Sequence, residues 1–164
     1  MLPGLALAGK HAYHVTGLEV TPTMTAPTTP AGYTASASTE FDTTYVAWKA
    51  FDGAFADSSW NSSAAGLPQW LQLQFPSAVY VASYKITSRP AGGETYAPGS
   101  FTLQGSNDGT NWTVVDTRTG QVFAVSETKT YTVAIPQPFV YWRLNITATP
   151  NGTYAGLTEL ELYG

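Results

Sequence analysis

Apolar and polar residues alternate with a period of two in several stretches of the chain after residue 69. In residues 70–75, two leucines and a phenylalanine alternate with two glutamines. The same period recurs in residues 81–87, 100–106, 131–136, 141–147 and 158–164. Such alternation places one face of a strand in a core and the other in water, so Tyr131, Val133 and Ile135 are expected to share a buried face. Many short strands between turn residues predict an all-β fold, an antiparallel jelly-roll β-sandwich.

The chain before residue 33 lacks this alternation. Residues 1–20 are mixed, and residues 21–32, TPTMTAPTTPAG, place prolines among threonines and alanines. This composition is typical of an extended linker. We therefore predict an N-terminal arm over residues 1–32 and one β-sandwich domain over residues 33–164, a length that suits a single domain.

The charge of the chain excludes two classes of partner. The net charge is −4, and only seven lysines and arginines are present in 164 residues. A nucleic-acid-binding protein needs clustered cations, and so does a protein that binds anionic membranes, so neither nucleic acid nor membrane insertion is expected. No apolar stretch approaches the length of a transmembrane helix. The absence of cysteine excludes disulfides and thiolate metal sites.

Six segments, taken in order, resemble one family: AFDG with Trp60 downstream, PQWLQLQF, ITSRP, FTLQGSNDGTNWTVV, YWRLNIT and the terminal LTELELYG. Residues 33–164 resemble the coagulation factor V/VIII type C, or discoidin-like, domain. Within that family they are most similar to the family 32 carbohydrate-binding modules. The resemblance implies a galactose-binding-domain-like sandwich of eight strands, with neighbouring termini and ligand-binding loops at one end.

The resemblance also implies a structural calcium ion beside the loop that holds Asp52. Its oxygen ligands would come from the last strand and from two loop segments, namely Lys49, Asp52, Asp57, Ser58, Thr158 and Glu159. Lys49 and Thr158 would supply backbone carbonyls, and Asp57 and Ser58 compete for one role because this loop is one residue longer than usual. Carboxylates and carbonyls suit Ca²⁺. The alternative is that Asp52-Gly53 forms only a turn.

A sugar site is implied at the loop end. The galactose-type sites of the family use a histidine, an aromatic residue, an arginine and a glutamate, which correspond here to Asn61, Ala64, Arg89 and Glu94. A stacking ring would then have to come from another loop, and Tyr96, Tyr154 and Phe55 are candidates. The alternatives are that Arg89 pairs with a carboxylate across a sheet, that Glu94 is a solvated charge and that Tyr154 covers a core edge. Four tryptophans are expected in the core or on a sheet face: Trp60, Trp70, Trp112 and Trp142.

The predicted function is noncatalytic, lectin-like binding of a glycan or cell-surface polysaccharide, for adhesion at an extracellular or virion surface. An alternative is a structural or receptor-binding subunit of a phage tail or capsid, docked on a larger protein assembly through residues 1–32. Catalysis is not expected, because both histidines lie in the arm and Glu94 lacks the partner carboxylate that a glycosidase needs. Phospholipid binding would need apolar loop spikes ringed by cations, which these loops lack.

Overall fold

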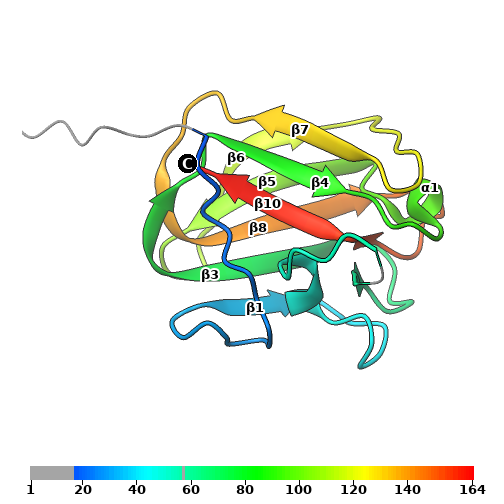
Figure 1. The fold of residues 1–164 in the computed structure, drawn as a ribbon. Coiled ribbons are helices and arrows are strands. Elements are labelled where there is room, and N and C mark those ends of the chain that lie inside the picture. The colour runs from blue at the N-terminus through cyan, green and yellow to red at the C-terminus, as the bar shows by residue number, and fades with distance from the viewer. Residues whose placement is uncertain (1–16, 57) are drawn as a thin grey trace, which may run out of the picture.

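Two antiparallel sheets face each other in the computed structural model, which describes residues 17–56 and 58–164 (Figure 1). The five-stranded sheet has the order β1-β3-β8-β5-β6, and the three-stranded sheet has the order β10-β4-β7. The strands of these sheets are β1 (Thr34–Ala37), β3 (Gln69–Tyr80), β4 (Ser83–Thr87), β5 (Ser100–Ser106), β6 (Thr113–Arg118), β7 (Thr128–Thr132), β8 (Pro138–Ala148) and β10 (Glu159–Tyr163). The all-β antiparallel sandwich is thus confirmed.

The core lies between the two sheets, where the alternating apolar residues meet. On β3, Leu71, Leu73 and Phe75 are at most 1% exposed, and their glutamine neighbours face outward. The apolar residues of β8 and β10 are buried in the same way. Because β3 and β8 pair in register across the middle of the large sheet, their buried side chains form one continuous layer.

One residue departs from the expected alternation. Tyr131 and Val133 are buried as predicted, but Ile135 is 73% exposed. Strand β7 ends at Thr132, so the pleat that would turn Ile135 toward the core does not continue to it. The prediction for Ile135 was therefore wrong, because a period-two pattern in sequence does not show where strand pairing stops.

The four tryptophans lie where they were expected. Trp60 and Trp142 are at most 1% exposed and belong to the core. Trp70 and Trp112 lie at the outer face of the large sheet, on either side of Arg143. The guanidinium of Arg143 is 3.8 Å from the ring centre of Trp112 and 5.9 Å from that of Trp70.

The described part of the predicted arm packs against the sandwich. The backbone N–H of Val20 donates to Leu162 at 2.8 Å, and that of Met24 donates to Phe51 at 2.8 Å. Met24 is 1% exposed and belongs to the core. Figure 1 shows this blue segment passing the C-terminal end of β10 and continuing to β1. The described part of this segment is therefore not a free linker, because it hydrogen-bonds to the edge strand β10 and then turns within residues 25–32. Residues 1–16 lie outside the described residues.

A buried hydrogen-bonded group joins the two sheets beside the core. The hydroxyl of Tyr84 on β4 donates to Asp116 on β6 at 2.6 Å, and Arg118 pairs with the same carboxylate at 2.8 Å. Burial, followed by this bond to Asp116, raises the pKa of Tyr84. The hydroxyl therefore stays protonated and acts as a fixed donor between the layers.

We expect Tyr84→Phe to lower the free energy of unfolding by about 1.5 kcal/mol, because a hydrogen bond to a charged carboxylate is lost while Arg118 still pairs with it. Urea unfolding followed by circular dichroism measures the change. Tyr163→Phe is the matched control, since the Tyr163 hydroxyl donates to Glu161 at 2.8 Å in a partly exposed setting. An equal decrease in the free energy of unfolding in both variants would contradict a larger contribution from the Tyr84–Asp116 hydrogen bond.

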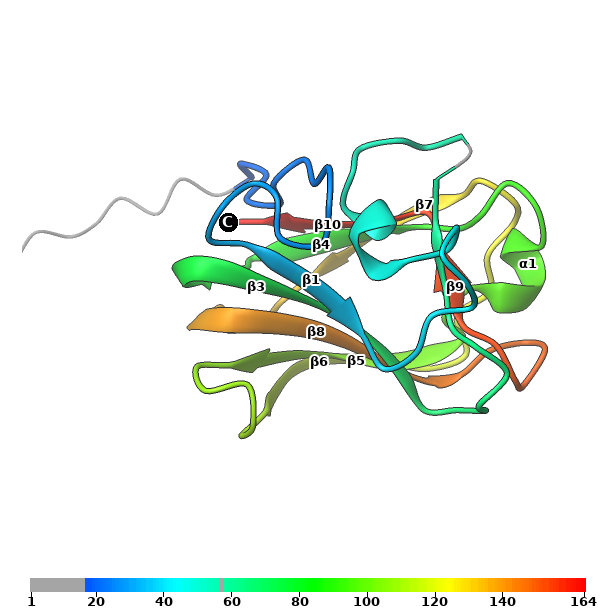
Figure 2. The same cartoon turned by 90° about the horizontal axis from the view of Figure 1, so that it is seen from below.

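Short elements gather at the end of the sandwich opposite the C-terminus (Figure 2). They are the 3₁₀ helix η1 (Ala47–Ala50), the helix α1 (Gly93–Tyr96), and the strands β2 (Trp60–Asn61) and β9 (Gly156–Leu157), which pair with each other. No helix in the described residues is long and apolar enough to span a membrane. The loops that connect these short elements form the candidate site.

Candidate functional site

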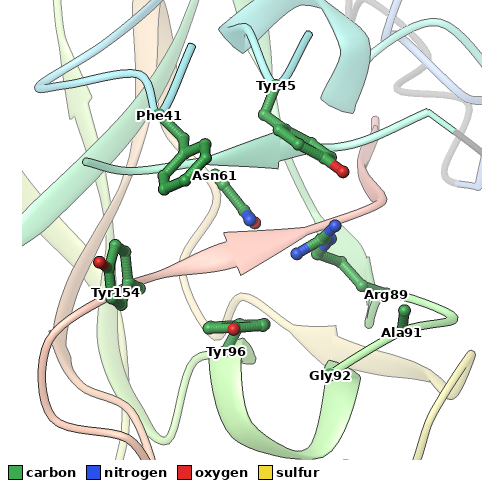
Figure 3. Close-up of a pocket in the computed structure, with 8 residues that line it drawn as sticks. All are labelled: Phe41, Tyr45, Asn61, Arg89, Ala91, Gly92, Tyr96 and Tyr154. Carbon is green, nitrogen blue, oxygen red and sulfur yellow. The ribbon is translucent and has the colours of Figure 1, made fainter. Parts of the chain in front are cut away.

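A pocket of about 480 Å³ opens among the loops at this end of the sandwich (Figure 3). It is lined by eight residues: Phe41, Tyr45, Asn61, Arg89, Ala91, Gly92, Tyr96 and Tyr154. These residues come from four separate parts of the chain: the loop before η1, strand β2, the segment from β4 through α1, and the loop before β9. Folding is therefore required to bring them together.

Asn61 forms the inner wall of the pocket and is held by its backbone. Its carbonyl accepts a hydrogen bond from the N–H of Phe41 at 2.8 Å, and its N–H donates to Tyr45 at 3.3 Å. Across the β2–β9 pair it faces Gly156, where a Cβ atom would lie 1.9 Å from Asn61 Oδ1. Only glycine leaves room there for the Asn61 side chain.

The Asn61 amide has unused hydrogen-bonding capacity. The residue is only 7% exposed, and its Oδ1 is buried without a hydrogen-bond partner among the described residues. A buried amide oxygen without a partner carries a desolvation penalty, and this oxygen packs against the backbone of Gly156. Figure 3 shows this side chain reaching into the space between the surrounding rings.

Arg89 supplies the positive charge of the pocket. Its Nε donates to the hydroxyl of Ser59 at 3.1 Å, and its guanidinium lies 4.8 Å from the ring centre of Tyr45 and 5.5 Å from that of Tyr96. In the described part of the chain, the ion pairs join Arg118 to Asp116 and Lys129 to Glu127, so neither involves Arg89. The expected alternative, a carboxylate partner across a sheet, is not what the structure shows.

The aromatic rings that line the pocket contact one another in edge-to-face or tilted pairs. The ring centres of Tyr96 and Tyr154 are 6.1 Å apart at 88°, and those of Phe41 and Tyr154 are 6.1 Å apart at 60°. Phe41 also contacts Tyr45 at 6.1 Å. Rings inclined in this way enclose the pocket and leave apolar faces for a ligand.

Two local features position these tyrosines. The side chain of Asn151 accepts the N–H of Tyr154 at 2.7 Å and donates to the carbonyl of Thr95 on α1 at 2.7 Å, so it joins the two loops. At Gly92, φ is +70°, and a Cβ there would lie 2.4 Å from the ring of Tyr96. Glycine is thus required for both the left-handed turn and the close approach of the ring.

A smaller hollow of about 140 Å³ adjoins the pocket and shares Tyr45, Arg89 and Ala91 with it. Its remaining lining residues are Ala56, Ser58, Ser59 and Pro90. Arg89 therefore stands on the boundary between the main pocket and the loop that carries the predicted calcium ligands.

The structure brings together four of the five residues predicted to bind a ligand: Asn61, Arg89, Tyr96 and Tyr154. Glu94 is exposed on α1 and does not line the pocket, so its position agrees with the alternative of a solvated charge. Phe55, 48% exposed, does not line it either.

Sequence reasoning missed Phe41 and Tyr45. The signal that could have found them is a pair of aromatic residues in the polar stretch FDTTY, around an aspartate that favours turns. In the structure the carboxylate of Asp42 accepts the N–H groups of Thr44 and Tyr45, and this turn directs both rings to one side.

The predicted calcium ligands Asp52 and Glu159 lie side by side. The N–H of Ala54 donates to Asp52 Oδ1 at 2.9 Å and to Glu159 Oε1 at 3.1 Å, so one donor joins both carboxylates. Glu159 is 1% exposed. Burial and then the neighbouring Asp52 raise the pKa of the Glu159 carboxyl to about 9. Two ionised carboxylates at these positions would repel each other, so the pair is stable only when a proton or a cation is shared with it.

Of the remaining predicted ligands, Ser58 contacts this pair directly. Ser58 donates its hydroxyl to Asp52, Thr158 is fully buried beside Glu159, and Lys49 lies in η1. Asp57 lies outside the described residues. Within the described residues, no group of three or more acidic, histidine or cysteine side chains that could hold a metal is present. The hard oxygen donors that are present suit Ca²⁺ in chemical type.

Comparison with known proteins places the chain in a family. Residues 34–160 match the model of the F5/8 type C domain, and the chain belongs to this family. A chitosan-binding module from a chitosanase/glucanase of Paenibacillus sp. IK-5 is 31% identical, with a TM-score of 0.68 over 81% of this chain and 96% of that one. The family 32 carbohydrate-binding module of Clostridium perfringens NanJ, solved in complex with galactose, is 25% identical, with a TM-score of 0.70 over 81% and 94%.

A further C. perfringens family 32 module, in complex with GalNAc-β-1,3-galactose, is 19% identical with a TM-score of 0.70 over 81% of this chain and 96% of that one, and it shows the shared fold. No protein among curated sequences matches the chain. The described part of the chain thus has the discoidin-like fold of the family 32 carbohydrate-binding modules, as the sequence resemblance implied.

Proposed function

We propose that this protein is a noncatalytic carbohydrate-binding module that holds a sugar in the pocket around Arg89. The observation that carries the proposal is the convergence of the Arg89 guanidinium, which is in no ion pair of the described residues, and the Asn61 amide in a pocket lined by aromatic side chains. Sugars present hydroxyls around apolar ring faces, and such sites combine a few oriented polar groups with aromatic walls. The galactose and chitosan named for the two relatives support a saccharide ligand.

The lining also supports a binding role without catalysis. A glycosidase needs two carboxylates that flank the bond to be broken. The eight lining residues include no Asp, Glu, His, Ser or Cys. Glu94, the acidic residue that the resemblance suggested for the site, lies outside the lining. We therefore expect binding and release of an unchanged sugar.

We further propose that a structural calcium ion is held beside Asp52 and Glu159, with oxygens from Lys49, Ser58 and Thr158. Such an ion supplies positive charge to two adjacent carboxylates, one of which is buried. It would cross-link the loop after η1 to the start of β10, which are distant in sequence. Ser58 and Ser59 then connect the metal loop to Arg89, because Ser58 bonds to Asp52 and Ser59 bonds to Arg89.

A single pocket of this size is expected to bind weakly, at roughly millimolar to tens of micromolar Kd. Adhesion to a polysaccharide surface, in an extracellular setting, would then need several copies, because effective concentration multiplies affinity. Docking to a larger assembly through residues 1–32 stays a prediction, since residues 1–16 lie outside the described residues.

The test is a screen of the protein on a glycan array, with Arg89→Ala beside it. We expect the wild type to bind at least one glycan and Arg89→Ala to lose about tenfold or more in affinity, because hydrogen bonds from a charged donor are removed. Arg143→Ala is the matched control, since Arg143 lies on the outer sheet face, away from the pocket. Equal binding by the wild type and Arg89→Ala would reject the pocket as the site.

A further inference from the structure

We propose that the ring of Phe41 is the surface on which the bound sugar stacks, and that Asp42 holds this ring in position. The inference rests on the proposed carbohydrate-binding function and assigns two residues of one loop their separate roles in it. It follows from the exposure of the aromatic rings in the pocket and from the hydrogen bonds of residues 40–47.

Phe41 is the most exposed of the four aromatic residues that line the pocket. It is 51% exposed, whereas Tyr45, Tyr96 and Tyr154 are partly buried. A half-exposed phenyl ring at the wall of a pocket presents apolar surface to whatever enters. A sugar that covers this ring with the apolar face of its own ring removes both surfaces from water, which favours binding.

The tyrosine rings of the pocket are engaged by other protein groups. The guanidinium of Arg89 lies over the ring of Tyr45 at 4.8 Å and over that of Tyr96 at 5.5 Å. Tyr154 contacts Tyr96 on one side and Phe41 on the other, with ring centres 6.1 Å apart in both pairs. Phe41 meets Tyr45 at 72° and Tyr154 at 60°, so neither of these rings stacks flat on it.

The backbone on either side of the Phe41–Tyr45 segment is tied to the polar wall of the pocket. The N–H of Phe41 donates to the carbonyl of Asn61 at 2.8 Å, and the N–H of Asn61 donates to the carbonyl of Tyr45 at 3.3 Å. The side chains of Phe41 and Asn61 both line the pocket (Figure 3). A pyranose stacked on Phe41 therefore brings its hydroxyls toward the Asn61 amide, whose N–H groups can donate to them.

Asp42 makes the turn that presents the Phe41 ring. One carboxylate oxygen accepts the N–H of Thr44 at 2.7 Å and that of Tyr45 at 3.2 Å. Aspartate favours such a turn, because its short side chain reaches the backbone two and three residues further on. Asp42 is exposed and does not line the pocket, so we assign it a positioning role without contact to the sugar.

The chain contains a matched control for each of the two residues. Phe55 is 48% exposed, as Phe41 nearly is, but it does not line the pocket. Asp108 makes the same turn as Asp42, since its Oδ1 accepts the N–H of Thr110 at 2.8 Å and that of Asn111 at 2.7 Å. This second turn lies between β5 and β6 and contributes no residue to the pocket lining.

The experiment compares the full chain with Phe41→Ala, Phe41→Trp, Phe55→Ala and Arg89→Ala in a dilution series on one glycan array. We expect Phe41→Ala to lose about tenfold or more in affinity for the glycans that the wild type binds, because a large aromatic contact is removed. Phe41→Trp should keep the affinity, because the indole offers an equally apolar face. Phe55→Ala should bind as the wild type does, and unfolding curves verify that all four variants fold.

Phe41→Trp also reports contact with the sugar directly. The tryptophan emission of this variant is expected to change on titration with galactose or with a chitosan oligosaccharide, which correspond to the saccharides named for two relatives. The change is measured against the wild type, whose five tryptophans give the background emission. Phe55→Trp carries an indole outside the pocket and should show no such change.

The role of Asp42 is tested by its own pair of variants. Asp42→Ala removes the acceptor of both N–H groups and is expected to lose about threefold to tenfold in affinity, because the Phe41 ring is no longer held. Asp42→Asn should restore most of the affinity, since the amide oxygen accepts the same two N–H groups. Asp108→Ala removes a comparable turn elsewhere and should leave the affinity unchanged.

The outcomes separate this inference from the function on which it rests. If Phe41→Ala binds as the wild type does while Arg89→Ala does not, the stacking role fails and the carbohydrate-binding function stands. The same conclusion follows if Phe55→Ala loses as much affinity as Phe41→Ala, or if a bound sugar leaves the emission of Phe41→Trp unchanged. If Asp42→Asn binds as weakly as Asp42→Ala, or Asp108→Ala loses as much, the positioning role fails.

A wild type that binds no glycan on the array and neither sugar in titration would overturn both the inference and the carbohydrate-binding function.

Discussion

Replacement of Trp60 by alanine is expected to lower the free energy of unfolding by about 3–5 kcal/mol, the usual cost of truncating a large buried aromatic residue. Trp60 is fully buried, and its indole N–H donates to the carbonyl of Thr39 at 3.0 Å. The substitution leaves a cavity and also removes the donor for that carbonyl. Since a domain of this kind is stable by only about 5–15 kcal/mol, urea unfolding should show a much lower midpoint.

Trp112→Ala is the matched control for this prediction. Trp112 is partly exposed and stacks on Arg143 at 3.8 Å, so its loss is expected to cost about 1 kcal/mol.

The affinity for sugar should also fall in Trp60→Ala, measured at a temperature where this variant is still folded. Trp60 lies between Ser59 and Asn61 in the sequence, so its loss is expected to displace both. Similar unfolding midpoints for the two alanine variants would contradict the prediction that Trp60 contributes more to core stability than Trp112 does.

At the proposed site, calcium at a hundredfold excess over its Kd is expected to raise the free energy of unfolding by about 2.7 kcal/mol, because an ion that binds only the folded state stabilises it by mass action. For a domain of this size, the melting temperature in EDTA should be roughly 5–10 °C lower than in calcium. Scanning calorimetry in the two buffers measures the difference. Asp52→Ala is expected to abolish the response, because it removes one of the two adjacent carboxylates.

The chain provides a control for this prediction in Asp108, which also begins an Asp-Gly step. Hydrogen bonds from the backbone and side chain of Asn111, and then from Thr110, hold the pKa of Asp108 below its ordinary value. This aspartate is thus satisfied by its own turn, and Asp108→Ala should leave the response to chelation intact. An identical melting temperature in calcium and in EDTA would reject the proposed calcium site. A proton on the Asp52–Glu159 pair would then replace the cation.

The candidate site was partly predictable for a clear reason. The family resemblance pointed to Asn61 and Arg89, and Tyr96 and Tyr154 are aromatic residues in stretches that were expected to be loops. Glu94 was assigned from the family resemblance, but the resemblance does not show that this side chain on α1 is exposed to solvent. Phe41 and Tyr45 belong to a loop far from the other lining residues, and only the β2–β9 end of the fold brings them together.

The sequence by itself determined the all-β class and the buried faces of strands such as β3 and β8, because side-chain alternation is a local property of extended backbone. Only the tertiary structure decided that Met24 enters the core, that Ile135 does not, and that Arg89 meets no lining carboxylate. These facts depend on contacts between segments that are distant in the chain. Burial, charge pairing and pocket lining are properties of such contacts, and no local pattern of residues contains them.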